Sequence, residues 1–162
     1  MATREKNLSY YDESQLPDAS DMRIGLVVSE WNPEITGKLL EGARETLLRV
    51  GVKDENIIVW KVPGSFELIY GARRMQENRF IDAIVAIGSI IRGETPHFDY
   101  VCQATSQGIK DLNVRGETPV IFCVLTDDNM QQARDRSGGK HGNKGVDCAV
   151  AAVKMAWLKQ NS

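Results

Sequence analysis

Short apolar runs alternate with amphipathic segments along most of the chain. The runs cover residues 23–29, 57–62, 83–89 and 119–125, and each is typical of a strand buried on both faces. A segment with helical character follows each run. Strands that alternate with helices favour right-handed crossovers, and so a parallel sheet covered by helices on both faces.

The first predicted helix has the clearest boundaries. Asn32 is a suitable N-cap and Pro33 a suitable first residue. Apolar residues then recur every four positions from residue 35 to 47, and Gly51 is a suitable end. The pattern predicts further helices at about 65–78, at 99–112, from near 129, and from the end of the glycine-rich break at 138–142 to about 160.

These elements predict one α/β domain. We expect a three-layer α/β/α sandwich whose four-stranded parallel sheet has the flavodoxin-like order 2-1-3-4. Residues 1–21 are polar and lack helical periodicity, which indicates a flexible N-terminal arm with a short pairing segment near its end. Residues 22–162 then form the domain, without an internal repeat or a second linker.

The composition narrows the class of protein. The 162 residues are 42% apolar and 26% charged with a net charge of −2, which gives no electrostatic case for binding nucleic acid. No apolar run approaches the roughly 20 residues that span a bilayer, and the N-terminus lacks the apolar core of a secretory signal. Cys102, Cys123 and Cys148 lie far apart, which favours a reduced, cytoplasmic protein.

The loop after the third apolar run carries the most chemistry. Ligands of open α/β sheets bind beyond the carboxyl ends of the strands, where this loop is expected. Residues 92–95 offer successive backbone N–H groups and a hydroxyl, an arrangement suited to phosphate. His97 follows in the same loop, and imidazole moves protons near neutral pH. A loop histidine is usually a plain surface residue, but the shared loop favours a catalytic role.

Other loop residues keep two interpretations open. Trp31 is either a platform for stacking a flat heterocycle or a side chain packed on its own domain. Glu67 either accepts hydrogen bonds from a ligand or complements a helix dipole. Arg136 and Lys144, on either side of the glycine-rich break, suit phosphate binding but also suit solvated helices. The chain has no P-loop, no dinucleotide-binding glycine motif and no clustered metal ligands in its sequence.

Three blocks in the right order carry a family resemblance. They are residues 63–67 (PGSFE), 88–101 (GSIIRGETPHFDYV) and 142–149 (GNKGVDCA). With these blocks the segment 22–158 resembles 6,7-dimethyl-8-ribityllumazine synthase, a transferase of the penultimate step of riboflavin biosynthesis. The resemblance implies condensation of 5-amino-6-(D-ribitylamino)uracil with 3,4-dihydroxy-2-butanone 4-phosphate, without metal or organic cofactor. Phosphate and water would be released.

The resemblance also assigns the site residues. His97 would be the catalytic, proton-transferring residue. The ribitylaminouracil would be bound by Trp31, Ser65, Phe66, Glu67, Ser89, Ile90, Ile91 and Phe122. The butanone phosphate would be held by Glu94, Thr95 and Arg136, with Lys144 as an accessory basic residue. Phe122 and Arg136 match positions that reach in from a neighbouring subunit.

The assembly implied is a homo-oligomer. The family forms cyclic pentamers, and some members stack twelve pentamers into a 60-subunit icosahedral shell and associate with riboflavin synthase. The compact turn between Arg136 and Asn143 favours the shell, whereas the long arm with Pro17 would obstruct stacking. Trp31 stands where many relatives carry phenylalanine, so riboflavin is a candidate ligand that copurifies.

Two other functions fit parts of the sequence. A non-catalytic flavin carrier of flavodoxin-like fold would use the same Trp31 platform, but it has no need for Glu94, Thr95, His97 and Arg136 together. A shell or scaffold protein with a vestigial pocket is opposed by the intact polar loop. Formation of lumazine by a colourless protein would exclude the carrier, and one turnover assay would exclude the scaffold.

Overall fold

A four-stranded parallel sheet forms the centre of the protein. The computed structural model describes residues 6–78 and 80–162. Its sheet contains β1 (Ile24–Ser29), β2 (Ile57–Val62), β3 (Ala83–Ile91) and β4 (Val120–Asp127) in the order β2-β1-β3-β4. All three strand pairs are parallel, so the predicted fold class and strand order are confirmed.

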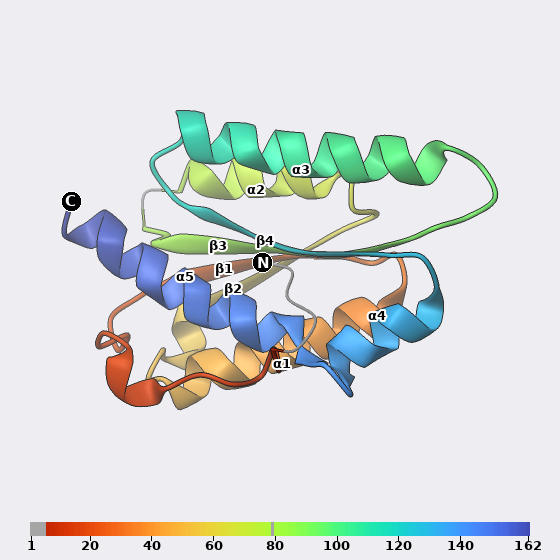
Figure 1. Ribbon diagram of the computed structural model, residues 1–162. Helices are drawn as coiled ribbons and strands as arrows, with labels where there is room; N and C mark the ends of the chain where they lie inside the picture. Colours follow the sequence, from red (N-terminus) through yellow and green to blue (C-terminus); the bar gives the residue numbers. More distant parts are fainter. Residues whose placement is uncertain (1–5, 79) are drawn as a thin grey trace.

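Helices cover both faces of the sheet. They are α1 (Pro33–Arg49), α2 (Leu68–Gln76), α3 (His97–Arg115), α4 (Met130–Arg136) and α5 (Lys144–Gln160). Figure 1 shows α2 and α3 on one face and α1, α4 and α5 on the other. Two short 3₁₀ helices, Glu13–Gln15 and Asp54–Asn56, lie in the connections.

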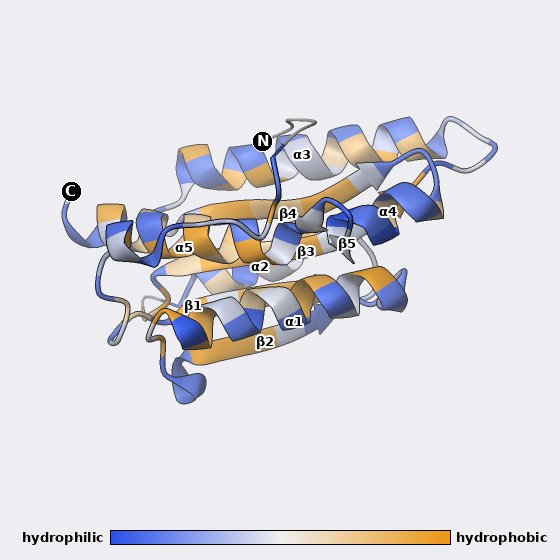
Figure 2. Ribbon diagram, turned by 60° about the horizontal axis from the view of Figure 1, so that its bottom comes forward, coloured by the Kyte–Doolittle hydropathy of each residue, from blue (hydrophilic) through white to orange (hydrophobic). Residues whose placement is uncertain are grey.

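The period of two along the strands divides the core into two apolar clusters. In β1, Leu26 and Val28 pack toward α1 and α5, while Val27 between them packs toward α2 and α3. Successive side chains of a strand point to opposite faces, so each central strand supplies both clusters. Figure 2 shows the hydrophobic colour gathered on these strands. The edge strand β2 is less covered, with Trp60 42% exposed.

Several predicted boundaries were wrong by two or three residues. β3 continues to Ile91 rather than ending near 89, because its last residues still pair with β4. The helix predicted to begin at 65 begins at Leu68, after a turn in which the Leu68 N–H bonds the Ser65 carbonyl at 3.3 Å. The helix predicted to begin near 99 begins at His97, because Pro96 adopts helical dihedrals as the N-cap. His97 therefore lies in the first turn of α3.

Asn32 is the N-cap of α1, as predicted, but its side chain acts differently. Its backbone is left-handed (φ 55°), and its side chain makes no capping hydrogen bond. The amide instead donates to the Ser89 carbonyl at 3.1 Å. This contact ties the loop after β1 to β3.

The glycine-rich break forms a small antiparallel hairpin that the sequence pattern did not reveal. It pairs β5 (Ser137–Gly139) with β6 (Gly142–Asn143), and Gly138 and Gly142 have positive φ angles of 117° and 82°. The arm contacts this hairpin through Leu8, whose N–H bonds the His141 carbonyl at 2.8 Å. Within residues 6–23 of the single chain no strand forms, so the pairing segment near the end of the arm stays a prediction.

Candidate active site

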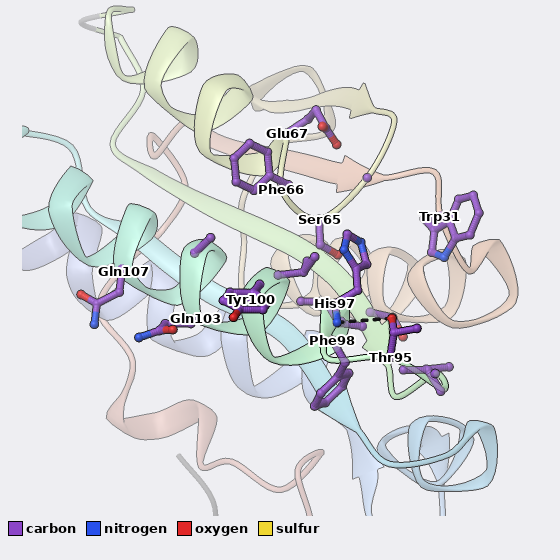
Figure 3. A pocket seen from close by; sticks show the side chains of 17 residues that line it. Trp31, Ser65, Phe66, Glu67, Thr95, His97, Phe98, Tyr100, Gln103 and Gln107 are labelled. Atoms are coloured by element: carbon purple, nitrogen blue, oxygen red, sulfur yellow. Dashed lines mark hydrogen bonds between the residues drawn. The ribbon is translucent and has the colours of Figure 1, made fainter.

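A cavity of about 980 Å³ opens where β1 and β3 end and runs between the turn before α2 and the first half of α3. Trp31 lies at one end of the site and Gln107 at the other (Figure 3). Of the predicted site residues, the cavity is lined by Trp31, Ser65, Phe66, Glu67, Ser89, Ile90, Ile91, Thr95 and His97. Three loops far apart in the sequence thus meet at one edge of the sheet, as expected for a parallel α/β fold.

Trp31 is available as a stacking platform. It follows β1 directly, and its backbone N–H donates to the Ser29 hydroxyl at 3.2 Å. The side chain is 69% exposed beside the cavity. Packing on its own domain would have buried the indole, so the geometry favours the platform.

Two serine hydroxyls in the cavity wall have no partner. Ser65 and Ser89 are 6% and 1% exposed, and neither Oγ atom has a hydrogen-bond partner among the described residues. A Cβ atom added at Gly88 would lie 2.7 Å from the Ser65 hydroxyl, so this wall is closely packed. Buried hydroxyls without partners cost free energy. A ligand with polar edges would remove this cost.

Glu67 is the N-cap of α2 but makes no side-chain capping hydrogen bond. Nor does its carboxylate form an ion pair within the described chain, which leaves both oxygens free to accept hydrogen bonds. Phe66, next to it, is 55% exposed on the same cavity. Together these residues suit a ligand that has both an apolar face and hydroxyl groups.

Arg92 stabilises the loop before α3. Its Nε donates to Asp128 at 2.9 Å and its Nη1 to Asp99 at 3.3 Å, while the guanidinium lies 4.2 Å from the centre of the Phe98 ring. The two carboxylates raise the pKa of Arg92 further above its ordinary value, with the Asp128 hydrogen bond as the main cause. The loop is thus held on both sides, and its backbone lies at the positive end of a long helix.

Thr95 belongs to this anion-attracting loop, and His97 is the first residue of the helix α3 that follows it. The backbone N–H of His97 donates to the Thr95 hydroxyl at 3.4 Å, as the dashed line in Figure 3 shows. The imidazole lines the cavity and has no hydrogen-bond partner in the described part of the chain. A free imidazole beside an anion site can exchange protons with a bound molecule.

Four predicted site residues lie outside the cavity. Glu94 is in the loop before α3, yet it does not line the cavity. Phe122 is half-buried in β4 and packs with the cluster under α2 and α3. Arg136 and Lys144 belong to α4 and α5 on the other face of the sheet, and Lys144 pairs with Asp147 at 2.6 Å. A single chain therefore does not bring Phe122, Arg136 and Lys144 to the cavity.

Sequence reasoning missed one wall of the cavity. Positions 98, 100, 101, 103, 104 and 107 line it from α3. The spacing of 100, 104 and 107 is that of one helix face, which is the signal that was available. The predicted helix 99–112 already contained most of these positions, but helical spacing alone does not distinguish a cavity wall from a face packed in the core.

The described residues contain no group of three or more His, Cys, Asp or Glu side chains that is arranged to hold a metal ion. Within the same residues, no helix is both long and apolar enough to cross a membrane. The three cysteines are free thiols, and Cys123 and Cys148 are buried.

Comparison with known proteins gives one consistent family. The model of the 6,7-dimethyl-8-ribityllumazine synthase family matches residues 21–160. Proteins of that description from Christiangramia forsetii and Flavobacterium johnsoniae are both 58% identical to this chain; they align over all of it and over 97% and 85% of their own lengths. The protein from Parabacteroides distasonis is 57% identical over 96% of this chain and 97% of its own. This chain therefore belongs to the 6,7-dimethyl-8-ribityllumazine synthase family.

Proposed function

We propose that this enzyme condenses 5-amino-6-(D-ribitylamino)uracil with 3,4-dihydroxy-2-butanone 4-phosphate to 6,7-dimethyl-8-ribityllumazine, the penultimate step of riboflavin biosynthesis. Family membership supports the activity. The structural observation that best supports it is a cavity with an exposed indole at one end. The wall of the same cavity carries a free histidine beside an anion-attracting loop. The three free thiols support a role in the reducing cytoplasm.

The cavity supplies what each bound substrate needs. The flat uracil ring stacks on Trp31, and the free hydroxyls of Ser65 and Ser89 meet its polar edge. The ribityl hydroxyls donate hydrogen bonds to Glu67. The phosphate binds at the loop containing Thr95, where backbone N–H groups and the start of α3 attract an anion. Both substrates are thereby oriented, and orientation alone supplies much of the rate.

The reaction then proceeds by condensation, elimination and ring closure, each of which moves protons, and the elimination expels an anion. The uracil amine attacks the ketone and water leaves to form an imine. Elimination expels inorganic phosphate, and the second amine closes the ring with loss of another water. His97 takes and returns protons in these steps, while the loop before α3 stabilises the leaving phosphate.

The residues that lie away from the cavity support a site shared between subunits. Arg136 and Phe122 are held on elements that do not reach their own chain's cavity, so we infer that a neighbouring copy supplies them. Large apolar side chains on α3 remain uncovered in one chain, with Tyr100 70% and Val114 74% exposed. A cyclic pentamer pairs every donor face with an acceptor face. The compact hairpin at 137–143 favours further stacking into a 60-subunit shell, which would have room for riboflavin synthase.

A two-substrate assay tests the reaction against the alternative of a flavin carrier. The exposed Trp31 would also bind a flavin, so binding alone does not discriminate. We expect lumazine, measured by its fluorescence, and inorganic phosphate to form in equimolar amounts after the purified protein is mixed with both substrates. Neither product should form when one substrate is omitted. Tight flavin binding without any lumazine formation would support the carrier instead.

A further inference from the structure

Asp127 is a buried carboxylate at the end of β4. It is 5% exposed, and it pairs in register with Ile91 of the cavity wall. Its backbone carbonyl accepts a hydrogen bond from the Arg92 N–H at 3.0 Å. One carboxylate oxygen, Oδ1, lies 3.6 Å from Nη1 of Arg136, whereas Oδ2 has no hydrogen-bond partner among the described residues.

Arg136 is held by one edge of its guanidinium. Nη1 donates to the Gln132 carbonyl at 3.0 Å and faces Asp127. Within the described residues, Nε and Nη2 make no hydrogen bond, and the side chain is 37% exposed. The Nε–H and Nη2–H groups thus remain available to a ligand, and two such parallel N–H groups bind phosphate oxygens in pairs.

We propose that Asp127 is a positioning residue that fixes the guanidinium of Arg136 for the phosphate of the butanone substrate. This rests on the proposed role of Arg136. The backbone carbonyl of Asp127 also holds Arg92, which lies in the phosphate loop of the same chain's cavity. Asp127 therefore contacts both that loop and the arginine that the chain would supply to the neighbouring subunit's cavity. Without the carboxylate, the long side chain of Arg136 would become ordered only when the substrate binds, and the lost side-chain entropy would weaken binding.

The energetics separate this role from a structural one. Burial raises the pKa of Asp127; Arg136 opposes that shift, while Asp128 and Asp135 add to it. Arg92, the other charged residue in contact, touches only the backbone carbonyl. A carboxyl whose pKa is higher in the folded state binds more protons there, so stability falls as pH rises from its unfolded pKa through its folded pKa. The ionised carboxylate thus destabilises the fold at neutral pH, and removing it should not lower the unfolding midpoint.

The test compares Asp127→Asn, Arg136→Ala and the double variant by steady-state kinetics and thermal unfolding at pH 7. We expect Asp127→Asn to raise KM for the butanone phosphate about 2- to 12-fold, the effect of leaving one long side chain unordered. KM for the uracil and kcat should stay unchanged, and the unfolding midpoint should be equal or higher. The double variant should be no worse than Arg136→Ala. The matched control is Asp135→Asn. Asp135 is also a buried carboxylate, but it lies on α4 and pairs with Gln131 and Lys140. This variant should keep KM for the butanone phosphate within about twofold.

Each contrary result has its own meaning. A carboxylate also repels phosphate, so an unchanged or lower KM in Asp127→Asn would show that repulsion outweighs positioning and would overturn the proposal. A clear fall in the unfolding midpoint, or failure to fold, would show a structural role and would also overturn it. If Arg136→Ala itself leaves the KM for the butanone phosphate unchanged, the role of Arg136 in the proposed function fails as well.

Discussion

The substitution Gly145→Ala should loosen the packing of α5 on α1. Gly145 lies in the first turn of α5, and a Cβ atom placed there would be 2.0 Å from the Leu39 carbonyl oxygen of α1. Ordinary contact begins at 3.4 Å, so the two backbones must separate by roughly 1.4 Å, the difference of these distances. The neighbouring atom is backbone, and no side-chain rotation relieves the overlap.

The cost follows from that separation. A gap of 0.5–1 Å already removes about a quarter to a half of the dispersion energy of the atoms concerned, and overpacked cores typically lose about 1–3 kcal/mol, occasionally more. We expect about 3 kcal/mol here, because α1 and α5 share an extensive apolar contact on one face of the sheet. For a chain of this size that corresponds to a fall in Tm of about 6–12 °C.

Thermal unfolding by circular dichroism at fixed protein concentration measures the effect. The matched control is Gly37→Ala, an exposed position in α1 where an added Cβ meets nothing within 4 Å. Alanine is favoured over glycine inside a helix by about 0.5–1 kcal/mol, so this variant should raise Tm by about 1–4 °C. If both variants shifted Tm in the same direction and by the same amount, the reasoning from backbone contact would be refuted.

Two further predictions concern catalysis and assembly. His97→Asn should keep the fold and both substrate affinities but lower kcat about 10²- to 10⁴-fold, as is typical for loss of general acid–base catalysis; an unchanged kcat at saturating substrates would remove His97 from the mechanism. Light scattering of the purified protein should give a mass of five or sixty chains; a mass near five would reject the shell, and an active monomer would reject a site shared between subunits.

The fold was predictable because its signals are local. Apolar runs with turn residues between them located all four strands of the parallel sheet, and the rules for parallel crossovers limited their order. Tertiary contacts decided what the pattern did not show. The hairpin at 137–143 depends on glycines in left-handed conformations and on a hydrogen bond to Leu8, far away in the sequence. The side chain of Asn32 does not cap α1 as expected but donates a hydrogen bond to a backbone carbonyl of β3.

The site was predictable only in part for a similar reason. Loop position pointed to Trp31, Glu67 and His97, because strand ends gather at one edge of a parallel sheet. The α3 wall was missed because helical spacing does not show whether a helix face lines a cavity or packs in the core. Phe122 was assigned by resemblance alone. The residue type of Arg136 suggested phosphate binding, but only the resemblance suggested that it acts on another chain.

Subunit complementation tests the shared active site most directly. His97→Ala removes a residue of the cavity, and Arg136→Ala removes a residue that we assign to the neighbour's cavity. The two variants are mixed in equal amounts, unfolded, reassembled as rings, and assayed at a butanone phosphate concentration too low for Arg136→Ala alone to turn over. An intact site then needs His97 from one variant and Arg136 from the other. Random assembly gives this with a probability of one half times one half, so about a quarter of wild-type lumazine formation should return. No recovery from correctly assembled mixed rings would contradict a site built from two chains.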